Sequence, residues 1–149
     1  MVFFDTSALI RRYDRGEPSS DHVRNLCRRE NGHTLLIAQL TSVEFASALN
    51  RKVRERSLTR VDCDRLWRLF RLHRRDQYQV LAIDNETTMM AEALLFSHRL
   101  RAYDAIQLAS AIRTSRLLGD LAPDFRFCTA DQAQAEAASA EGLAVELIA

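Results

Sequence analysis

Short apolar runs alternate with longer helical stretches along almost the whole chain, and this alternation is the feature that most restricts the fold. Such runs, rich in β-branched and aromatic residues or stopped by helix-capping residues, are typical of buried strands. Strands that alternate with helices form βα units and a mostly parallel sheet covered on both faces. We therefore predict an α/β fold. The expected strands are residues 2–4, 35–38, 78–83, 125–129 and 143–148, and the expected helices are residues 19–30, 41–56, 59–75, 86–98, 103–118 and 132–141.

The length and composition indicate one domain. The 149 residues contain no Gly-, Ser- or Pro-rich linker, so we predict a single domain over residues 1–149. The content of 47% hydrophobic and 28% charged residues excludes a disordered chain. No apolar run reaches the roughly 18 residues of a membrane-spanning helix, and an acid at position 5 does not fit a signal peptide. We expect a cytoplasmic protein without a membrane partner.

Four acidic residues are candidates for one site. Asp5 and Asp131 directly follow predicted strands, and ligands of parallel sheets bind beyond the carboxyl ends of strands. Glu44 lies in the helix after the second strand, and Asp104 stands one turn before Leu108, at the edge of an apolar stripe. Two unit charges 4 Å apart repel by about 4 kcal/mol at an effective dielectric of 20, so such a cluster requires a cation. Carboxylates suit Mg²⁺ or Mn²⁺, and phosphodiester cleavage is the chemistry implied.

Each acid also has a structural explanation, which the sequence leaves open. Asp5 and Asp131 are good helix N-caps, and Asp5-Thr6-Ser7 is typical of a helix start. Glu44 is the last residue of a capping box that begins at Thr41. Asp104 has a possible partner in Arg101, because an unpaired charge beside the buried face is costly.

Four segments of the chain carry a further signal: Val2–Tyr13, Thr41–Leu49, Leu100–Ala111 and Phe127–Asp131 followed by Glu141-Gly142-Leu143. They resemble the PIN-domain family and, within it, the VapC toxins of bacterial toxin-antitoxin pairs. The resemblance implies a three-layer α/β/α sandwich and an endoribonuclease that hydrolyses RNA phosphodiester bonds with water activated by Mg²⁺ or Mn²⁺.

Site roles follow from the same resemblance. Asp5, Glu44, Asp104 and Asp131 match the four catalytic acids of the family, with Asp5, Asp104 and Asp131 as metal ligands. Thr6 and Thr129 match polar positions that hold the carboxylates or waters by hydrogen bonds. Asp120 and Asp124 are weaker alternatives for the fourth acid, because only Asp131 directly follows the strand as in the family.

A basic segment is the expected contact for RNA. Residues 51–75 hold ten basic and three acidic residues, although the whole chain has a net charge of only +1. We predict that Arg68 and Arg71 contact phosphates, with a solvated helix face as the alternative. The resemblance implies a homodimer and a cognate VapB-like antitoxin, for whose groove Trp67 and Phe70 are candidates. Packing in the core is the alternative for both aromatic side chains.

Two further functions remain open at this stage. A PIN-type nuclease in RNA processing shares the fold and the acids and differs only in its substrate. A catalytically idle relative that binds RNA or protein is disfavoured because all four acids are present. A receiver-like signalling domain is also disfavoured, because it needs a lysine near a late strand end and the only lysine, Lys52, lies within a predicted helix.

Overall fold

The computed structural model describes residues 1–149 and has one five-stranded sheet, in which every strand pair is parallel. The strand order is β3-β2-β1-β4-β5, so β1 lies in the centre between β2 and β4. This confirms the predicted α/β class. The strands are β1 Val2–Phe4, β2 Leu35–Ala38, β3 Tyr78–Leu81, β4 Arg126–Thr129 and β5 Ala144–Leu147.

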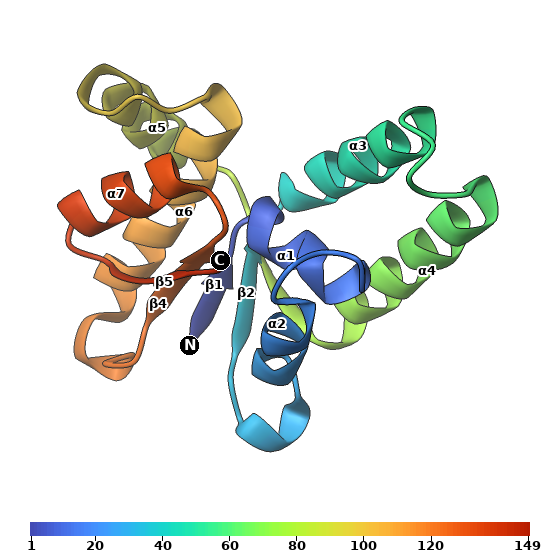
Figure 1. The fold of residues 1–149 in the computed structure, drawn as a ribbon. Coiled ribbons are helices and arrows are strands. Elements are labelled where there is room, and N and C mark those ends of the chain that lie inside the picture. Colours follow the sequence, from blue (N-terminus) through green and yellow to red (C-terminus); the bar gives the residue numbers. More distant parts are fainter.

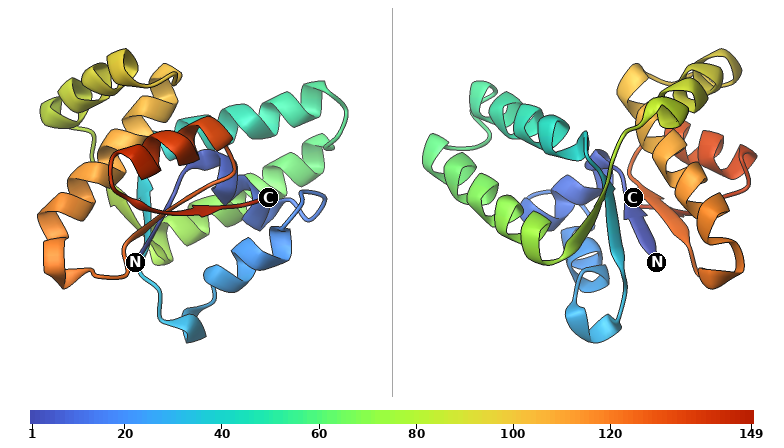
Figure 2. Two further views of the ribbon diagram at one scale, coloured as in Figure 1. Left: turned by 60° about the vertical axis from the view of Figure 1, so that its left-hand side comes forward. Right: turned by 180° about the vertical axis from the view of Figure 1, so that it is seen from behind.

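Seven helices cover the two faces of the sheet, α1 to α4 on one and α5 to α7 on the other (Figures 1 and 2). The three central strands are buried on both faces, as strands of a parallel sheet between two helical layers should be. The three-layer sandwich is therefore confirmed. The helices are α1 Thr6–Tyr13, α2 Ser20–Leu26, α3 Thr41–Arg54, α4 Arg60–Asp76, α5 Asn85–Ser97, α6 Ala102–Leu118 and α7 Gln132–Ala140, with short 3₁₀ turns η1 Arg29–Asn31 and η2 Gly119–Leu121.

Helix α1 was predicted only as a helix start at Asp5-Thr6-Ser7, and the boundaries of most other elements differ from the prediction by one or two residues. The largest difference is at α2. The helix predicted for residues 19–30 ends at Leu26, and η1 then turns the chain toward β2. Gly32 closes η1 with a φ of 67°, which a glycine adopts without strain. The third strand stops at Leu81 instead of residue 83, because its last partner on β2 is Ala38.

Each face of the sheet has its own hydrophobic core. Alternate residues of β1 point to opposite sides, so that Val2 and Phe4 pack under α1 to α4 while Phe3 packs under α5 to α7. Cys27, Cys63 and Cys128 are free and buried. None of the helices has the length and apolar character that a bilayer crossing requires.

The first core decides where the two candidate groove residues lie. Phe70 is completely buried, with its ring stacked 4.3 Å from that of Phe45 and edge-on to Tyr13. Its assignment to a partner groove is therefore wrong, because the side chain has no exposed surface. Trp67 is half-buried and stacks on Phe70 at 5.6 Å, so part of its ring reaches the surface.

Candidate active site

The candidate site lies where the direction of strand connection reverses. From β1 the chain first builds outward to β2 and β3, and then crosses to place β4 on the other side of β1. In open parallel sheets this reversal leaves a crevice beyond the carboxyl ends of the two strands, where ligands bind. Asp5 follows β1 and Asp131 follows β4 at this crevice, and the N-terminal turns of α3 and α6 add Glu44 and Asp104.

Asp5 is the most deeply buried of the four acids, with 1% of its surface exposed. It caps α1 by accepting from the Ala8 backbone N–H at 2.8 Å, so its predicted capping role is confirmed. Its Oδ2 also accepts from the hydroxyls of Ser7 at 2.7 Å and Thr129 at 2.9 Å, and from the Gln134 amide at 3.0 Å. The carboxylate is thus fixed by donors from both ends of the chain.

Asp104 and Asp131 are half-buried, and both accept a hydrogen bond from Gln134, Asp104 from its side-chain amide and Asp131 from its main-chain N–H. The Nε2 atom of Gln134 donates to Oδ2 of Asp5 at 3.0 Å and to Oδ1 of Asp104 at 3.1 Å. Asp131 caps α7 by accepting from the Gln134 backbone N–H at 3.0 Å. The only hydrogen bond from Arg101 to Asp104 comes from its main-chain N–H, at 3.3 Å, so the expected pairing with the guanidinium is absent.

Glu44 does not form the predicted capping box. Helix α3 is capped by Leu40, and Thr41 already lies inside the helix. The Oε2 atom of Glu44 instead accepts from the Thr6 hydroxyl and from Nε2 of Gln107, both at 2.6 Å. Because these donors come from α1 and α6, the side chain is held toward the other acids and not toward its own helix.

Burial and mutual repulsion leave the acids in a strained electrostatic state. Burial, and more weakly the charge of Glu44, raises the pKa of Asp5 to about 7. Burial also raises the pKa of Asp104, and the charges of Asp131 and Glu44 act in the same direction. Each of the four carboxylates therefore raises the pKa of another acid or has its own pKa raised, which shows that they are electrostatically coupled.

All four acids line one cavity of about 480 Å³. Arg51, Arg101 and Tyr103, all exposed, lie at its rim. Lys52 also borders the cavity, but its ammonium is paired with Asp14 at 2.9 Å and with Glu17. The charge of Lys52 is therefore used within the protein, whereas the two arginines form no ion pair.

The donor set fits a hard divalent cation. It consists of carboxylate oxygens, which Mg²⁺ and Mn²⁺ prefer, and the raised pKa values of Asp5 and Asp104 mark negative charge that lacks a counter-charge. No three of the acids meet at metal-ligand spacing, since the Gln134 amide lies between Asp5 and Asp104. The Oε1 atom of Gln134 is buried without a hydrogen-bond partner, so only the NH₂ group of this amide is hydrogen-bonded.

The sequence prediction named the acids but missed their amide partners. Gln107 and Gln134 are both almost completely buried and donate to three of the four acids. No sequence pattern marked either amide as a hydrogen-bond donor, although Gln107 lies one turn after Asp104. Thr6 and Thr129 touch Glu44 and Asp5 as the prediction required.

Other predicted residues lie away from this cavity. Asp120 is exposed on η2, and Asp124 lines a separate cavity beside Met1 at the opposite edge of the sheet. Asp131 is therefore the only one of the three candidates for the fourth acid that joins the site. Arg68 and Arg71 are exposed on α4 and border no part of the acidic cavity.

Comparison with known proteins agrees with this geometry. The family model of the PIN domain matches residues 2–139, and the chain therefore belongs to the PIN-domain family. A comparison with curated protein sequences gave no match.

Three solved structures share the fold at low identity. VapC20 of Mycobacterium tuberculosis, a toxin that cleaves the sarcin-ricin loop, has a TM-score of 0.65 at 17% identity, with 96% of each chain covered. VapBC2 of Rickettsia felis, bound to promoter DNA, has a TM-score of 0.63 at 12% identity over 99% of this chain and 98% of that one. FitAcB of Neisseria gonorrhoeae has a TM-score of 0.61 at 13% identity over 97% and 96%.

Proposed function

We propose that this protein is a metal-dependent endoribonuclease and the toxin of a VapBC-like toxin-antitoxin pair. The observation that carries the proposal is the convergence of Asp5, Glu44, Asp104 and Asp131 in one cavity at the reversal point of the sheet. Structural neighbours described as toxins, one of which cleaves an RNA loop, support the choice of RNA as substrate.

Asp5, Asp104 and Asp131 are the residues that would hold the cation. A bound Mg²⁺ or Mn²⁺ lowers the pKa of water and neutralises charge that develops on a phosphoryl group. Thr129 and Ser7 keep Asp5 oriented through its oxygens before RNA arrives. The Gln134 amide, which bridges Asp5 and Asp104, occupies the space between two of these ligands.

Glu44 has a separate part in the chemistry. Both of its hydrogen bonds go to Oε2, so Oε1 is left to orient the attacking water and to accept its proton. The guanidiniums of Arg51 and Arg101 at the rim can bind phosphates on either side of the cleaved bond, and the ring of Tyr103 can stack on a base.

Cleavage of cellular RNA tests this proposal. Wild-type protein, Asp104→Asn and the matched control Asp120→Asn are each incubated with Mg²⁺, with Mn²⁺ and with EDTA, and the product ends are mapped. We expect discrete cuts with 5′-phosphate and 3′-hydroxyl ends that require metal, vanish in Asp104→Asn and persist in Asp120→Asn.

The other outcomes are informative as well. Cyclic 2′,3′-phosphate ends would show that water is not the nucleophile. No cleavage by the wild type would favour the catalytically idle relative, and cuts confined to precursor RNAs would favour a processing nuclease over a toxin.

The antitoxin partner is part of the same proposal. Val61, Leu69 and Leu72 are exposed on α4, and the ring of Trp67 on the same helix is half-buried, so α4 presents apolar side chains at the surface. A fourth solved structure with this fold, a toxin-antitoxin complex from Klebsiella pneumoniae with a TM-score of 0.58 at 17% identity over 88% of this chain and 87% of that one, supports a protein partner. Co-expression with a neighbouring antitoxin gene tests this, because a Trp67→Ala change should weaken the complex while leaving RNA cleavage intact. The homodimer stays a prediction, which sedimentation analysis of the purified protein can test.

A further inference from the structure

A second cavity, of about 820 Å³, lies at the opposite end of α1 from the acidic one. It is enclosed by the end of α1, by α2 with the turn after it, and by the C-terminal half of α4. We call it the basic cavity. Five arginines and one histidine line it, against a single acid: Arg12, Arg15, Arg24, Arg28, Arg29, His73 and Asp21.

The arginines of the basic cavity have almost no counter-charge. Arg12, Arg15, Arg24 and Arg29 form no ion pair, and Arg28 contacts only the exposed Glu30, at 3.5 Å. Single surface arginines without an ion-pair partner are common. Here four of them line one cavity, and they come from more than one helix, so they do not form the solvated face of a single helix. Their combined field attracts anions into the cavity.

Arg12 is held in place by neutral groups. Its guanidinium donates to the hydroxyl of Tyr78 and to Oε1 of Gln77 at 2.5 Å, and it lies 5.3 Å from the centre of the Tyr78 ring. The Tyr78 hydroxyl is bonded in turn to that of Tyr13 at 2.7 Å. This half-buried charge is therefore preorganised, and none of its partners neutralises it.

His73 lines the same cavity. Burial is the main cause that lowers the pKa of His73 to about 4; the guanidinium of Arg12 and, more weakly, that of Arg29 act in the same direction, and Asp76 opposes them. The imidazole is thus neutral at physiological pH and accepts or donates one hydrogen bond with Tyr13 at 3.0 Å.

We propose that the basic cavity binds phosphate groups of the RNA strand whose cleavage occurs in the acidic cavity. This rests on the proposed function. The four acids repel a polyanion, and only Arg51 and Arg101 at the rim of their cavity oppose this, so a second basic surface strengthens the attraction of RNA. Planar guanidiniums match phosphate oxygens in pairs. A volume of about 820 Å³ also suits a nucleotide-sized group.

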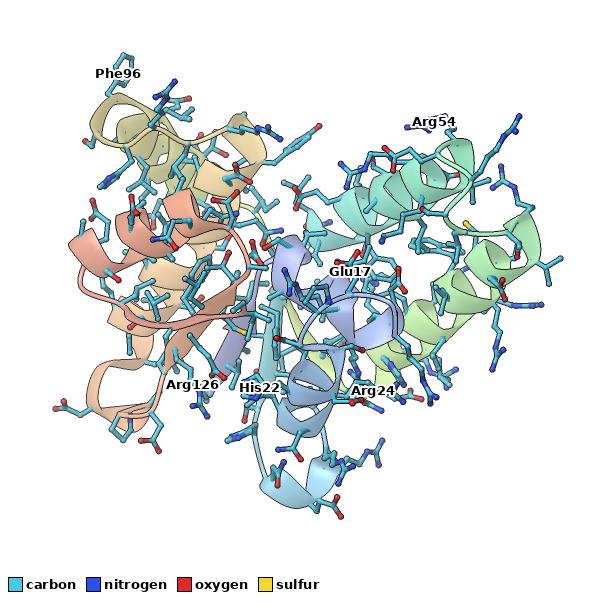
Figure 3. All side chains as sticks on the ribbon, in the orientation of Figure 1. Glu17, His22, Arg24, Arg54, Phe96 and Arg126 are labelled. Atoms are coloured by element: carbon cyan, nitrogen blue, oxygen red, sulfur yellow. The ribbon has the colours of Figure 1, made fainter.

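The two cavities are close enough for one strand to reach both. Arg15 borders the basic cavity and Glu17, two residues further along, borders the acidic one. Two residues of extended chain span at most about 7 Å, which is close to the spacing of neighbouring phosphates in a single strand. Figure 3 shows Glu17 in the α1–α2 connection and Arg24 on α2, on the same side of the molecule.

Binding of RNA without cleavage tests the proposal. Fluorescence anisotropy in EDTA measures the affinity of a labelled single-stranded RNA for the wild type and for the double variant Arg24→Gln/Arg29→Gln. The charge-matched control is Arg99→Gln/Arg116→Gln, whose residues lie outside both cavities and outside the basic segment 51–75. Loss of two phosphate contacts should flatten the salt slope by about 1.4 and weaken binding roughly 25-fold at 0.1 M salt. The control should stay within about twofold, and urea unfolding confirms that all variants are folded.

The outcomes separate this proposal from the proposed function. Equal affinities of the two double variants would overturn the basic cavity as an RNA site, even if metal-dependent cleavage is intact. Cleavage by Arg24→Gln/Arg29→Gln with a raised KM and an unchanged kcat would support it, since remote contacts act on binding. If this variant keeps its affinity for RNA and loses affinity for a polyglutamate peptide, the cavity receives an acidic protein segment and the RNA assignment is wrong.

Discussion

Replacing Asp5 with asparagine should stabilise the metal-free protein at neutral and alkaline pH. Burial raises the pKa of Asp5 from 3.8 to about 7. A difference of about 3 pKa units corresponds to about 4 kcal/mol, at 1.36 kcal/mol per unit. Because the pKa of Asp5 is higher in the folded state than in the unfolded state, its protonated carboxyl contributes this free energy to stability below about pH 4. The contribution is lost as the pH rises through about 7, where the buried carboxyl ionises.

The hydrogen bonds of Asp5 reduce the expected gain. An asparagine can still accept from the Ala8 N–H through its oxygen, and the hydroxyls of Ser7 and Thr129 can rotate to accept from its NH₂ group. That NH₂ group would, however, face the Nε2 donor of Gln134, which lies 3.0 Å from the carboxylate. Loss of one such bond costs about 1 to 1.5 kcal/mol. We therefore expect Asp5→Asn to raise the free energy of unfolding at pH 8 by about 2 to 3 kcal/mol.

Urea unfolding in EDTA at pH 5 and at pH 8, followed by circular dichroism, measures this effect. The difference between Asp5→Asn and wild type is the relevant quantity, because His73, with its pKa lowered to about 4, makes both proteins gain stability as the pH rises toward 6.5. Asp120→Asn, an exposed acid, should show no such difference. If the advantage of Asp5→Asn over wild type is the same at both pH values, Asp5 does not carry the charge strain inferred from its burial.

Three other substitutions test separate parts of the structure. Phe70→Ala should lower the free energy of unfolding by about 3 to 5 kcal/mol in the same urea assay, because it empties a fully buried aromatic site; a loss below about 1 kcal/mol would contradict core packing. Gln107→Leu should cost about 1 to 3 kcal/mol, since Glu44 loses a 2.6 Å donor, and an unchanged midpoint would show that water replaces the amide. Charge reversal of Arg68 and Arg71 to glutamate should raise the Kd for RNA and flatten its salt dependence. Unchanged anisotropy curves would show that these two arginines of α4 do not contact RNA.

The acids could be predicted from the sequence because their position follows from strand ends. Asp5 and Asp131 stand directly after buried runs, and the carboxyl ends of parallel strands lie at one edge of a sheet. No comparable rule exists for the neutral amides. Gln107 and Gln134 sit on helices with no pattern that marks them as hydrogen-bond donors to acids from other elements.

Two errors arose where tertiary contacts outweigh local preference. Thr41 and Glu44 have the spacing of a capping box, yet Glu44 gains stronger donors from Thr6 and Gln107 and turns away from its helix start. Phe70 and Trp67 lie on one amphipathic helix, and periodicity cannot tell which of them faces the core and which reaches the edge. Only the packing of α4 against α3 and β3 separates them.

The central position of β1 links the first element of the chain to one of the last. Thr129 donates to Asp5 across 124 residues, and β4 must pair beside β1 before that bond can form. During synthesis the N-terminal half emerges first, and it contains Asp5 and Glu44 but neither Asp104 nor Asp131. A nascent chain therefore carries an incomplete set of acids. A chain truncated before β4 lacks Asp131, so the four carboxylates cannot assemble in it.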